Sequence, residues 1–170
     1  MSAKTIRVLV VDDSALMREM ICDGIEKAPA MEVAGCASDG DKALEAMDRI
    51  HPDVVTLDIQ MPNRDGLSTL DEILTRRPVP VLMVSAHTRL GADITLDALD
   101  RGAIDYVAKP DSRTEAERVF SEELPRKIRS VAGTDVKRIL EIRHARKRRR
   151  QEHRQRRQQQ QAVSKQAPET

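Results

Sequence analysis

Aromatic side chains are almost absent from this 170-residue sequence, which has no tryptophan and only the rings of Tyr106 and Phe120. Binding of single-stranded nucleic acid by base stacking needs several exposed rings, so the composition excludes that mode. No apolar run approaches the roughly 20 residues that a membrane-spanning helix requires. Strand-like sequence begins already at Ile6, which leaves no room for a signal peptide. We therefore expect a cytoplasmic protein that makes no contact with a membrane.

Cysteine is equally scarce, because Cys22 and Cys36 are the only two. Their spacing matches no metal-binding pattern, and two thiols make a poor disulfide framework. We interpret both as small core residues of a protein in a reducing compartment.

A large net charge is absent too, since the formal value for the whole chain is +1. The two ends nevertheless differ strongly. Residues 1–110 carry 12 Lys+Arg against 19 Asp+Glu, a net charge of −7, whereas residues 111–170 carry 17 against 9, a net charge of +8. We predict a folded domain over residues 1–131 and a basic, Arg- and Gln-rich tail over residues 132–170.

The sequence does contain a regular alternation of short apolar runs and amphipathic stretches. The apolar runs predict strands over residues 6–11, 32–37, 54–57, 81–84 and 106–108. Apolar residues at helical spacing predict helices over residues 14–27, 41–50, 65–77 and 92–101. Five strand–helix units in a row predict an α/β fold, a doubly wound parallel sheet with helices on both faces.

The pattern is less regular after the fifth predicted strand. We expect residues 111–117 to be a loop and Ser121 to cap a last helix, so that Pro125 falls in the first turn, where little is lost. A second helical pattern starts after Gly133 and fades within about three turns. The remaining sequence has no apolar face, and we expect a solvated helix or a disordered tail.

Polar side chains follow four of the five predicted strands. They are Asp12 and Asp13 after the first strand, Asp58 after the third, Ser85 after the fourth and Lys109 after the fifth. Because the carboxyl ends of parallel strands meet at one edge of a sheet, we expect them to gather there. Carboxylate oxygens are ligands that Mg²⁺ prefers, and a bound cation would offset the repulsion between Asp12 and Asp13. The alternative for these two is capping of the next helix, where a carboxylate favours the helix dipole.

These segments resemble, in order and in spacing, the receiver domains of two-component response regulators. The resemblance rests on VLVVDDS, DVVTLDIQMPNRDGL, VLMVSAH and GAIDYVAKP and covers about residues 4–131. More narrowly, VDDSALMR, ASDGDKALE, PDVVTLDIQMP and GAIDYVAKP look like the receiver of the chemotaxis protein-glutamate methylesterase (CheB) family. The resemblance implies a flavodoxin-like sheet of strand order 2-1-3-4-5.

Carried over residue by residue, the resemblance implies a phosphorelay protein whose phosphoacceptor is Asp58. The implied Mg²⁺ ligands are the carboxylates of Asp12, Asp13 and Asp58 and the backbone carbonyl of Gln60. Asp58 would then undergo self-phosphorylation and self-dephosphorylation. The implied phosphodonor partner is a histidine kinase of the chemotaxis type. An effector protein would bind the face formed by the fourth helix, the fifth strand and the last helix.

Three further roles follow from the same resemblance. The Lys109 ammonium would offset phosphoryl charge, and a cis bond to Pro110 would aim this side chain inward. The Ser85 hydroxyl would donate to a phosphoryl oxygen, and the ring of Tyr106 would enter the space that Ser85 vacates. Tyr106 has an alternative interpretation as a half-buried strand residue.

A methylesterase of this family also needs a Ser-His-Asp triad, which the sequence does not supply. No G-x-S-x-G motif occurs, and the last glycine is Gly133. The pair Ser85-x-His87 is better explained as a switch hydroxyl followed by a solvated loop residue. We expect no esterase activity from this chain, which is then either a stand-alone receiver or a truncated methylesterase.

Residues 137–157 carry 11 Lys+Arg and two Glu, a net charge of +9. This segment is either a solvated tail, including one that results from a frameshift, or an electrostatic arm. An arm would bind nucleic acid or an acidic partner, or dock on the acidic domain of the same chain.

Overall fold

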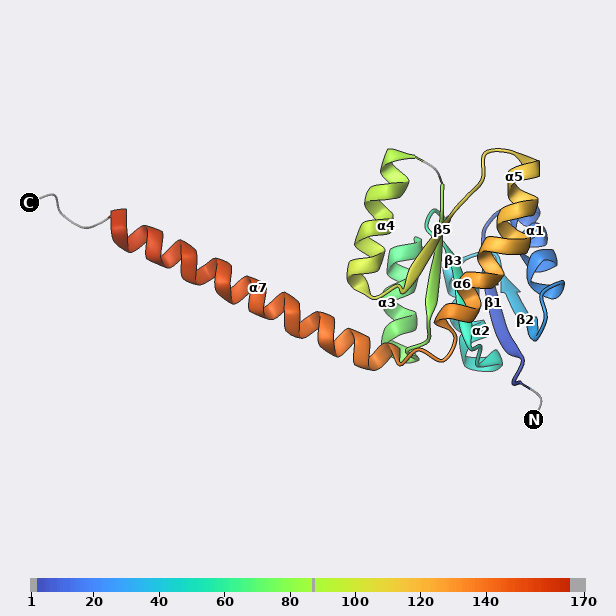
Figure 1. Ribbon diagram of the computed structural model, residues 1–170, viewed down its shortest axis with the longest axis horizontal. Helices are drawn as coiled ribbons and strands as arrows, with labels where there is room; N and C mark the ends of the chain where they lie inside the picture. The colour runs from blue at the N-terminus through green and yellow to red at the C-terminus, as the bar shows by residue number, and fades with distance from the viewer. Residues whose placement is uncertain (1–2, 87, 166–170) are drawn as a thin grey trace, which may run out of the picture. The chain divides into compact units, whose positions relative to one another are not determined.

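The structure is a computed structural model that describes residues 3–86 and 88–165 (Figure 1). The chain divides into two compact units between Val136 and Lys137. The boundary that we placed between residues 131 and 132 stays a prediction. His87, which we expected to be a solvated loop residue, lies outside the described residues.

Five parallel strands form the sheet of the first unit, in the order β2-β1-β3-β4-β5. The strands are β1 (Ile6–Val11), β2 (Met31–Ala37), β3 (Val54–Asp58), β4 (Val81–Ser85) and β5 (Asp105–Ala108). Every residue of β3 and β4 is buried, because helices cover both faces of the sheet, and this explains their unbroken apolar sequence. The predicted fold class and strand order are confirmed.

The helices of this unit lie in two layers, one on each face of the sheet (Figure 1). One layer contains α1 (Ala15–Glu26), α5 (Arg113–Arg118) and α6 (Leu124–Val131), and the other contains α2 (Gly40–Ile50), α3 (Gly66–Arg76) and α4 (Arg89–Arg101). The N-terminus of each of the first five helices is capped by a short polar side chain. These caps are Ser14, Asp39, Asp65, Thr88 and Ser112. Each cap satisfies a backbone N–H that has no partner within its helix.

The helix after β5 begins earlier than we predicted. Residues 113–117 are helical rather than a loop, because the Ser112 side chain accepts a hydrogen bond from the N–H of Glu115 and starts α5. Ser121 is therefore not an N-cap; its hydroxyl donates to the carbonyl of Glu117 at 2.6 Å. The predicted loop is wrong because this first helical turn exposes most of its side chains, so its sequence is as polar as that of a loop.

Pro125 also sits inside a continuous helical segment rather than at its start. The turn before it, Val119–Glu123 (η1), is π-helical, and the N–H of Leu124 bonds to the carbonyl of Val119. A proline removes one helical hydrogen bond and crowds the preceding turn, and the wider π turn gives the ring room.

The second unit is helical along its described part. Helix α7 (Val136–Lys165) has 30 residues, and residues 146–164 are all exposed. Of the two forms that we predicted for the basic tail, the structure contains the helix. Among the described residues, no helix is long and apolar enough to cross a membrane.

Candidate functional site

Three carboxylates meet at the carboxyl edge of the sheet. Asp12 follows β1 and is fully buried, Asp58 ends β3 with 2% of its surface exposed, and Asp13 is exposed. One carboxylate oxygen from each lies within 4.8 Å of the other two. β1 and β3 are neighbours in the sheet, so strand pairing alone brings the end of one beside the end of the other. The predicted gathering of these side chains is found in the structure.

Lys109 brings a positive charge into this cluster from the end of β5. Its Nζ lies 3.2 Å from Asp12 Oδ2 and 3.2 Å from Asp58 Oδ1. The backbone N–H of Lys109 donates to the carbonyl of Ser85 at 2.6 Å and so ties this residue to the end of β4. The bond between Lys109 and Pro110 is trans, because the described residues contain no cis peptide bond. Our cis prediction was wrong, since the lysine side chain reaches the carboxylates from a trans backbone.

The remaining carboxylate oxygens are only partly satisfied. Asp12 Oδ1 accepts from the N–H of Ser14 at 2.9 Å, and Asp58 Oδ1 accepts from the N–H of Gln60 at 3.2 Å. Asp12 Oδ2 is buried and has only the Lys109 ammonium beside it, whereas Asp58 Oδ2 is buried and accepts no hydrogen bond from any described residue. A buried anionic oxygen without a donor is costly unless a cation is near. The donor set therefore fits a hard divalent ion such as Mg²⁺. The capping alternative is not found for Asp13, because Ser14 caps α1.

Burial has a strong effect on the titration of this cluster. The pKa of Asp58 is raised to about 7, first by desolvation and then by repulsion from Asp12, while Lys109 opposes the rise. Desolvation lowers the pKa of Lys109, but attraction to Asp58 and Asp12 outweighs it, so this pKa is raised overall. The lysine is therefore cationic at neutral pH.

Ser85 and Tyr106 lie on the two strands beside the cluster. Ser85 ends β4 and is 5% exposed, whereas Tyr106 in β5 is 43% exposed. Gln60 is exposed, two residues beyond Asp58. The strand pairing sets Ser85 opposite Ala108 and Tyr106 opposite Met83.

Three contributors to this region were missed by our sequence reasoning. Arg18 donates to the carbonyl of Asp12 at 2.7 Å, and the absence of a side chain at Gly66 lets the start of α3 approach the backbone of Asp58 and Ile59. Lys127 of α6 lies over the Tyr106 ring, with Nζ 5.1 Å from the centroid. Only Gly66 left a signal in the sequence, as a glycine in the first turn of the helix predicted over residues 65–77.

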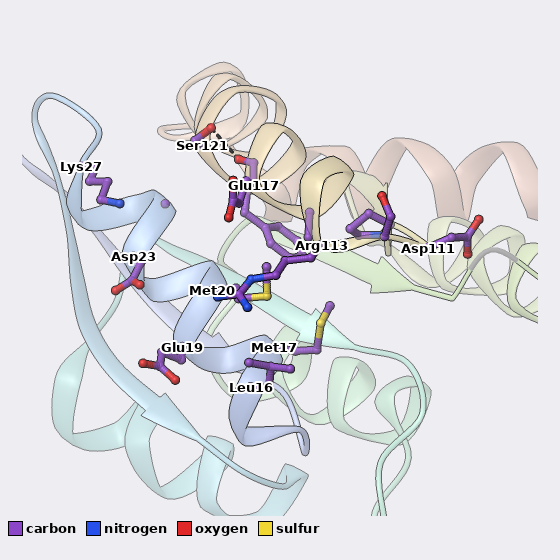
Figure 2. Close-up of a pocket in the computed structure, with 15 residues that line it drawn as sticks. Leu16, Met17, Glu19, Met20, Asp23, Lys27, Asp111, Arg113, Glu117 and Ser121 are labelled. Carbon is purple, nitrogen blue, oxygen red and sulfur yellow. Dashed lines mark hydrogen bonds between the residues drawn. The ribbon is translucent and has the colours of Figure 1, made fainter.

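Three hollows lie near this end of the molecule, one of which, of about 380 Å³, is lined by Lys109. Another, of about 600 Å³, adjoins the cluster and is lined by Asp13, Gln60 and Met61 among others. A groove of about 590 Å³ runs between α1 and α5, with Met20 and Arg113 on opposite walls (Figure 2). None of the three carboxylates lines this groove. Of the three carboxylates, only Asp13 lines the hollow of about 600 Å³.

The response regulator receiver domain family matches residues 8–119 of the chain. A protein-glutamate methylesterase/protein-glutamine glutaminase from Symbiobacterium thermophilum is 50% identical over 130 residues, which are 76% of this chain and 36% of that protein. One from Pyrococcus abyssi is 45% identical over 147 residues, 86% of this chain and 40% of that protein. The chain thus spans about two fifths or less of the length of these curated relatives.

Solved structures give the same result. The response regulator domain of Thermotoga maritima CheB is 45% identical, with a TM-score of 0.72, over 78% of this chain and 99% of that chain. The receiver domain of the putative response regulator NarL from Mycobacterium tuberculosis is 31% identical, with a TM-score of 0.62, over 75% and 98%. The resemblance inferred from the sequence is confirmed: the chain belongs to the response regulator receiver domain family and carries a receiver of the CheB type.

Proposed function

We propose that this chain accepts a phosphoryl group on Asp58 and thereby changes its affinity for a partner protein. The observation that supports this most is the surroundings of Asp58 Oδ2. This oxygen is buried without a hydrogen-bond donor among the described residues, beside two other carboxylates and a lysine. An oxygen atom in these surroundings can form a bond to an electrophile, provided that the electrophile brings a positive charge with it to balance the negative charges.

In the proposed reaction, a carboxylate oxygen of Asp58 attacks the phosphorus atom of a phosphodonor. The new bond joins this oxygen to phosphorus, and the bond between phosphorus and the donor's leaving group breaks, so that an acyl phosphate forms. The Lys109 ammonium lies 3.2 Å from Asp58 Oδ1, from where it can pair with phosphoryl oxygens. Water hydrolyses the acyl phosphate and makes the modification temporary.

The carboxylates of Asp12, Asp13 and Asp58 and the backbone carbonyl of Gln60 are the ligands that we propose for Mg²⁺. A bound Mg²⁺ would offset the negative charge of the carboxylates and the phosphoryl group. The buried Asp12 is also positioned by the bonds that Ser14 and Arg18 make to its side chain and carbonyl. Its carboxylate is therefore held in place before any ligand arrives.

The switch that we propose uses Ser85 and Tyr106. A phosphoryl group adds a charge of about −1.5 to −2 and three acceptor oxygens next to the end of β4. The Ser85 hydroxyl would donate to one of these oxygens, and the Tyr106 ring would move into the space that Ser85 leaves. The phosphoryl group needs to favour this arrangement by only a few kcal/mol to change which state dominates.

The experiment is incubation of the full chain with acetyl phosphate and Mg²⁺, followed by intact-protein mass spectrometry. We expect the mass of one phosphoryl group to be added to the wild-type chain and none to Asp58→Asn. Asp53→Asn is a matched control, because this partly exposed aspartate interacts with Lys4 and Arg7 instead. Label retained on the Asp58→Asn variant would contradict the assignment.

The physiological phosphodonor that we propose is a histidine kinase of the chemotaxis type. The similarity to CheB receivers supports this class of kinase. The effector surface that we propose combines α4, β5 and α6, the elements next to Tyr106. Phosphotransfer from a purified chemotaxis-type kinase, compared with a kinase of another class, would test the proposal; equal rates would contradict it.

We propose no esterase function for the 170 residues of this chain. The relatives share only their receiver part with it, and no G-x-S-x-G motif occurs in the sequence. A protein-glutamate methyl ester incubated with the full chain should release no methanol above the background rate. Turnover that depends on the protein would contradict this expectation.

Helix α7 supports a second, separate candidate function, the binding of nucleic acid. Its residues 137–157 have a net charge of +9, and the helix is about 45 Å long at 1.5 Å per residue. The basic residues include the run Arg148, Arg149 and Arg150, which at 100° per residue faces several directions. A rod with positive charge on most sides attracts phosphate backbones without reading base sequence.

This second candidate is tested by fluorescence anisotropy with labelled duplex DNA at two salt concentrations. We expect the affinity of the full chain to fall steeply with salt, with a slope of about 0.9 per phosphate contact. A shortened chain ending at Gly133 and a variant with Arg148, Arg149 and Arg150 changed to Gln should both bind more weakly. Equal affinity of all three chains would exclude the candidate.

A further inference from the structure

Of the two cysteines, Cys22 in α1 packs against the core as a half-buried residue, whereas Cys36 in β2 is exposed, contrary to our interpretation of both as core residues. Their Sγ atoms lie 3.2 Å apart. From this juxtaposition we propose that Cys22 and Cys36 are a modification site, at which hydrogen peroxide or a similar two-electron oxidant forms an intramolecular disulfide. The proposal is independent of phosphorylation at Asp58.

A β-bulge brings Cys36 to the correct face of the sheet. Along the first part of the pairing, Val8 lies opposite Val33, but Leu9 lies opposite Gly35, so β2 contains one extra residue. Without this residue Cys36 would turn to the opposite face, because side chains alternate along a strand. With it, Cys36 pairs with Val10, whose side chain belongs to the core on the α1 side.

Gly35 marks the same change of face. A Cβ atom built on Gly35 would collide with Ile50 of α2, on the other side of the sheet. The next residue therefore points towards α1, where Cys22 packs against the edge of the core. Because β2 is an edge strand, this flank of the sheet is open and the Cys36 thiol remains accessible.

Disulfide formation at this site needs little movement. A disulfide has an S–S length of about 2.05 Å, so the two sulfur atoms must approach by about 1 Å, which side-chain rotation can supply. The bridge would close a loop over residues 22–36 and fix the C-terminal half of α1 to the edge strand. Closing a loop of this length with a covalent bond reduces the conformational entropy of the unfolded chain, so oxidation should raise the urea midpoint of unfolding.

The chemistry balances in two steps. The exposed Cys36 thiol is oxidised by hydrogen peroxide to a sulfenic acid, which releases one water molecule. The Cys22 sulfur then attacks the Cys36 sulfur, and the S–O bond breaks to release a second water, so that two electrons pass from the thiols to the peroxide. Burial first, and then the contact with Cys36, raises the pKa of Cys22 to about 12. Cys22 is therefore not the thiol that we expect to react first with the peroxide, and its proton leaves with the hydroxyl of the sulfenic acid as water.

The experiment treats the full chain with hydrogen peroxide under denaturant-free conditions and measures free thiols, intact mass and disulfide-linked peptides. We expect the loss of both thiols and of two hydrogen masses, a peptide that links Cys22 to Cys36, and full reversal by dithiothreitol. The oxidised monomer should also unfold at a higher urea concentration than the reduced one.

The serine variants separate the roles of the two thiols. Cys36→Ser should leave Cys22 reduced, whereas Cys22→Ser should leave Cys36 as a sulfenic acid or as a disulfide between two chains. Retention of both thiols by the wild-type chain, a Cys36–Cys36 dimer as its main product, or over-oxidation of Cys36 without a bridge would each overturn the proposal. Because the decisive readout is the wild-type chain, it does not depend on the stability of either variant.

Discussion

The Lys127 ammonium makes two contacts with Tyr106: its Nζ lies 5.1 Å from the centre of the ring and donates a hydrogen bond to the Tyr106 carbonyl at 2.5 Å. The same ammonium lies 3.7 Å from Asp105 and 3.6 Å from Glu123. The ring is 43% exposed in this arrangement, and a cation over an exposed ring stabilises it by about 0.5–1 kcal/mol. Lys127 thus favours the outward position of the proposed switch residue.

Tyrosine fluorescence can report on this position directly, because Tyr106 is the only tyrosine and the chain has no tryptophan. We expect acetyl phosphate with Mg²⁺ to make the fluorescence less accessible to acrylamide, because the ring moves inward. Asp58→Asn should show no change and Ser85→Ala a smaller one. Unaltered quenching in a chain whose mass proves phosphorylation would rule out the ring movement.

Lys127→Met should shift the same equilibrium without a phosphodonor. The substitution keeps an apolar stem but removes the cation, so the inward population should rise by about two- to five-fold. Acrylamide quenching of the unphosphorylated variant would then lie between the two wild-type values. Lys42→Met is the control, since this exposed lysine lies in the first turn of α2, away from the ring, and pairs with the N-cap residue Asp39. The same quenching in both variants would contradict the proposed restraint.

The raised pKa of Asp58, about 7, makes a prediction for stability against pH in the presence of a chelator. A carboxyl whose folded pKa lies above its unfolded value stabilises the fold while protonated, and this stability is lost as the pH rises towards 7. Asp58→Asn should therefore be more stable than the wild-type chain at pH 8, on the order of 3 kcal/mol. The two should approach each other at pH 5. Urea denaturation at both pH values checks this; a gap that does not change with pH would contradict it.

Lys109→Met should have the opposite effect. The variant removes the cation from beside two almost fully buried carboxylates, and breaking such a pair costs about 3–5 kcal/mol when burial is complete. Since Lys109 is 20% exposed, we expect a loss of about 2 kcal/mol at pH 8 with chelator and a smaller loss at pH 5. Added Mg²⁺ should restore part of the stability. An unchanged urea midpoint at pH 8 would show that the lysine is not needed to balance the carboxylates.

The sheet and the acidic cluster were accessible from the sequence because their signals are local. Continuous apolar runs define β1, β3 and β4, and Asp12 and Asp58 follow the runs that end at the same edge. The predicted bounds of β1 were identical to those observed, and the other strands differed by one residue at an end. Caps are equally local signals, since Ser14 stands directly before the apolar-periodic residues of α1 and Gly102 directly after those of α4.

The features that we missed depend on contacts between distant segments. No sequence signal near Cys36 predicts the bulge that turns the Cys36 side chain towards Cys22, because the extra residue is defined only by the pairing of β2 with β1. A lone proline ordinarily indicates a helix boundary, but the π turn before Pro125 lets the helical segment continue through it. Lys127 reaches Tyr106 across 21 positions, a separation that no periodicity encodes.

Gly66→Ala should disturb the proposed phosphorylation site from the backbone side. A Cβ atom at this position would lie 2.7 Å from Ile59 Cα and 2.8 Å from the Ile59 carbonyl oxygen, and would also collide with the Asp58 carbonyl. Backbone atoms cannot rotate away, so α3 and the connection after β3 must separate, at a cost of about 1–3 kcal/mol. Phosphorylation by acetyl phosphate should slow, because Asp58 and Gln60 move with that connection.

Gly40→Ala is the matched control, since it also lies at the first position of a helix. A Cβ atom there would collide with side chains, with the buried Thr69 Oγ1 at 2.2 Å and with Arg64 Cδ at 2.9 Å, so Thr69 must rotate and the long arginine side chain can move away. No backbone atom beside Asp58 is displaced, so we expect a loss of stability but a normal phosphorylation rate. Urea denaturation and timed mass spectrometry would separate the two variants. If both phosphorylated at the wild-type rate, close approach at Gly66 would not be what positions the β3–α3 connection.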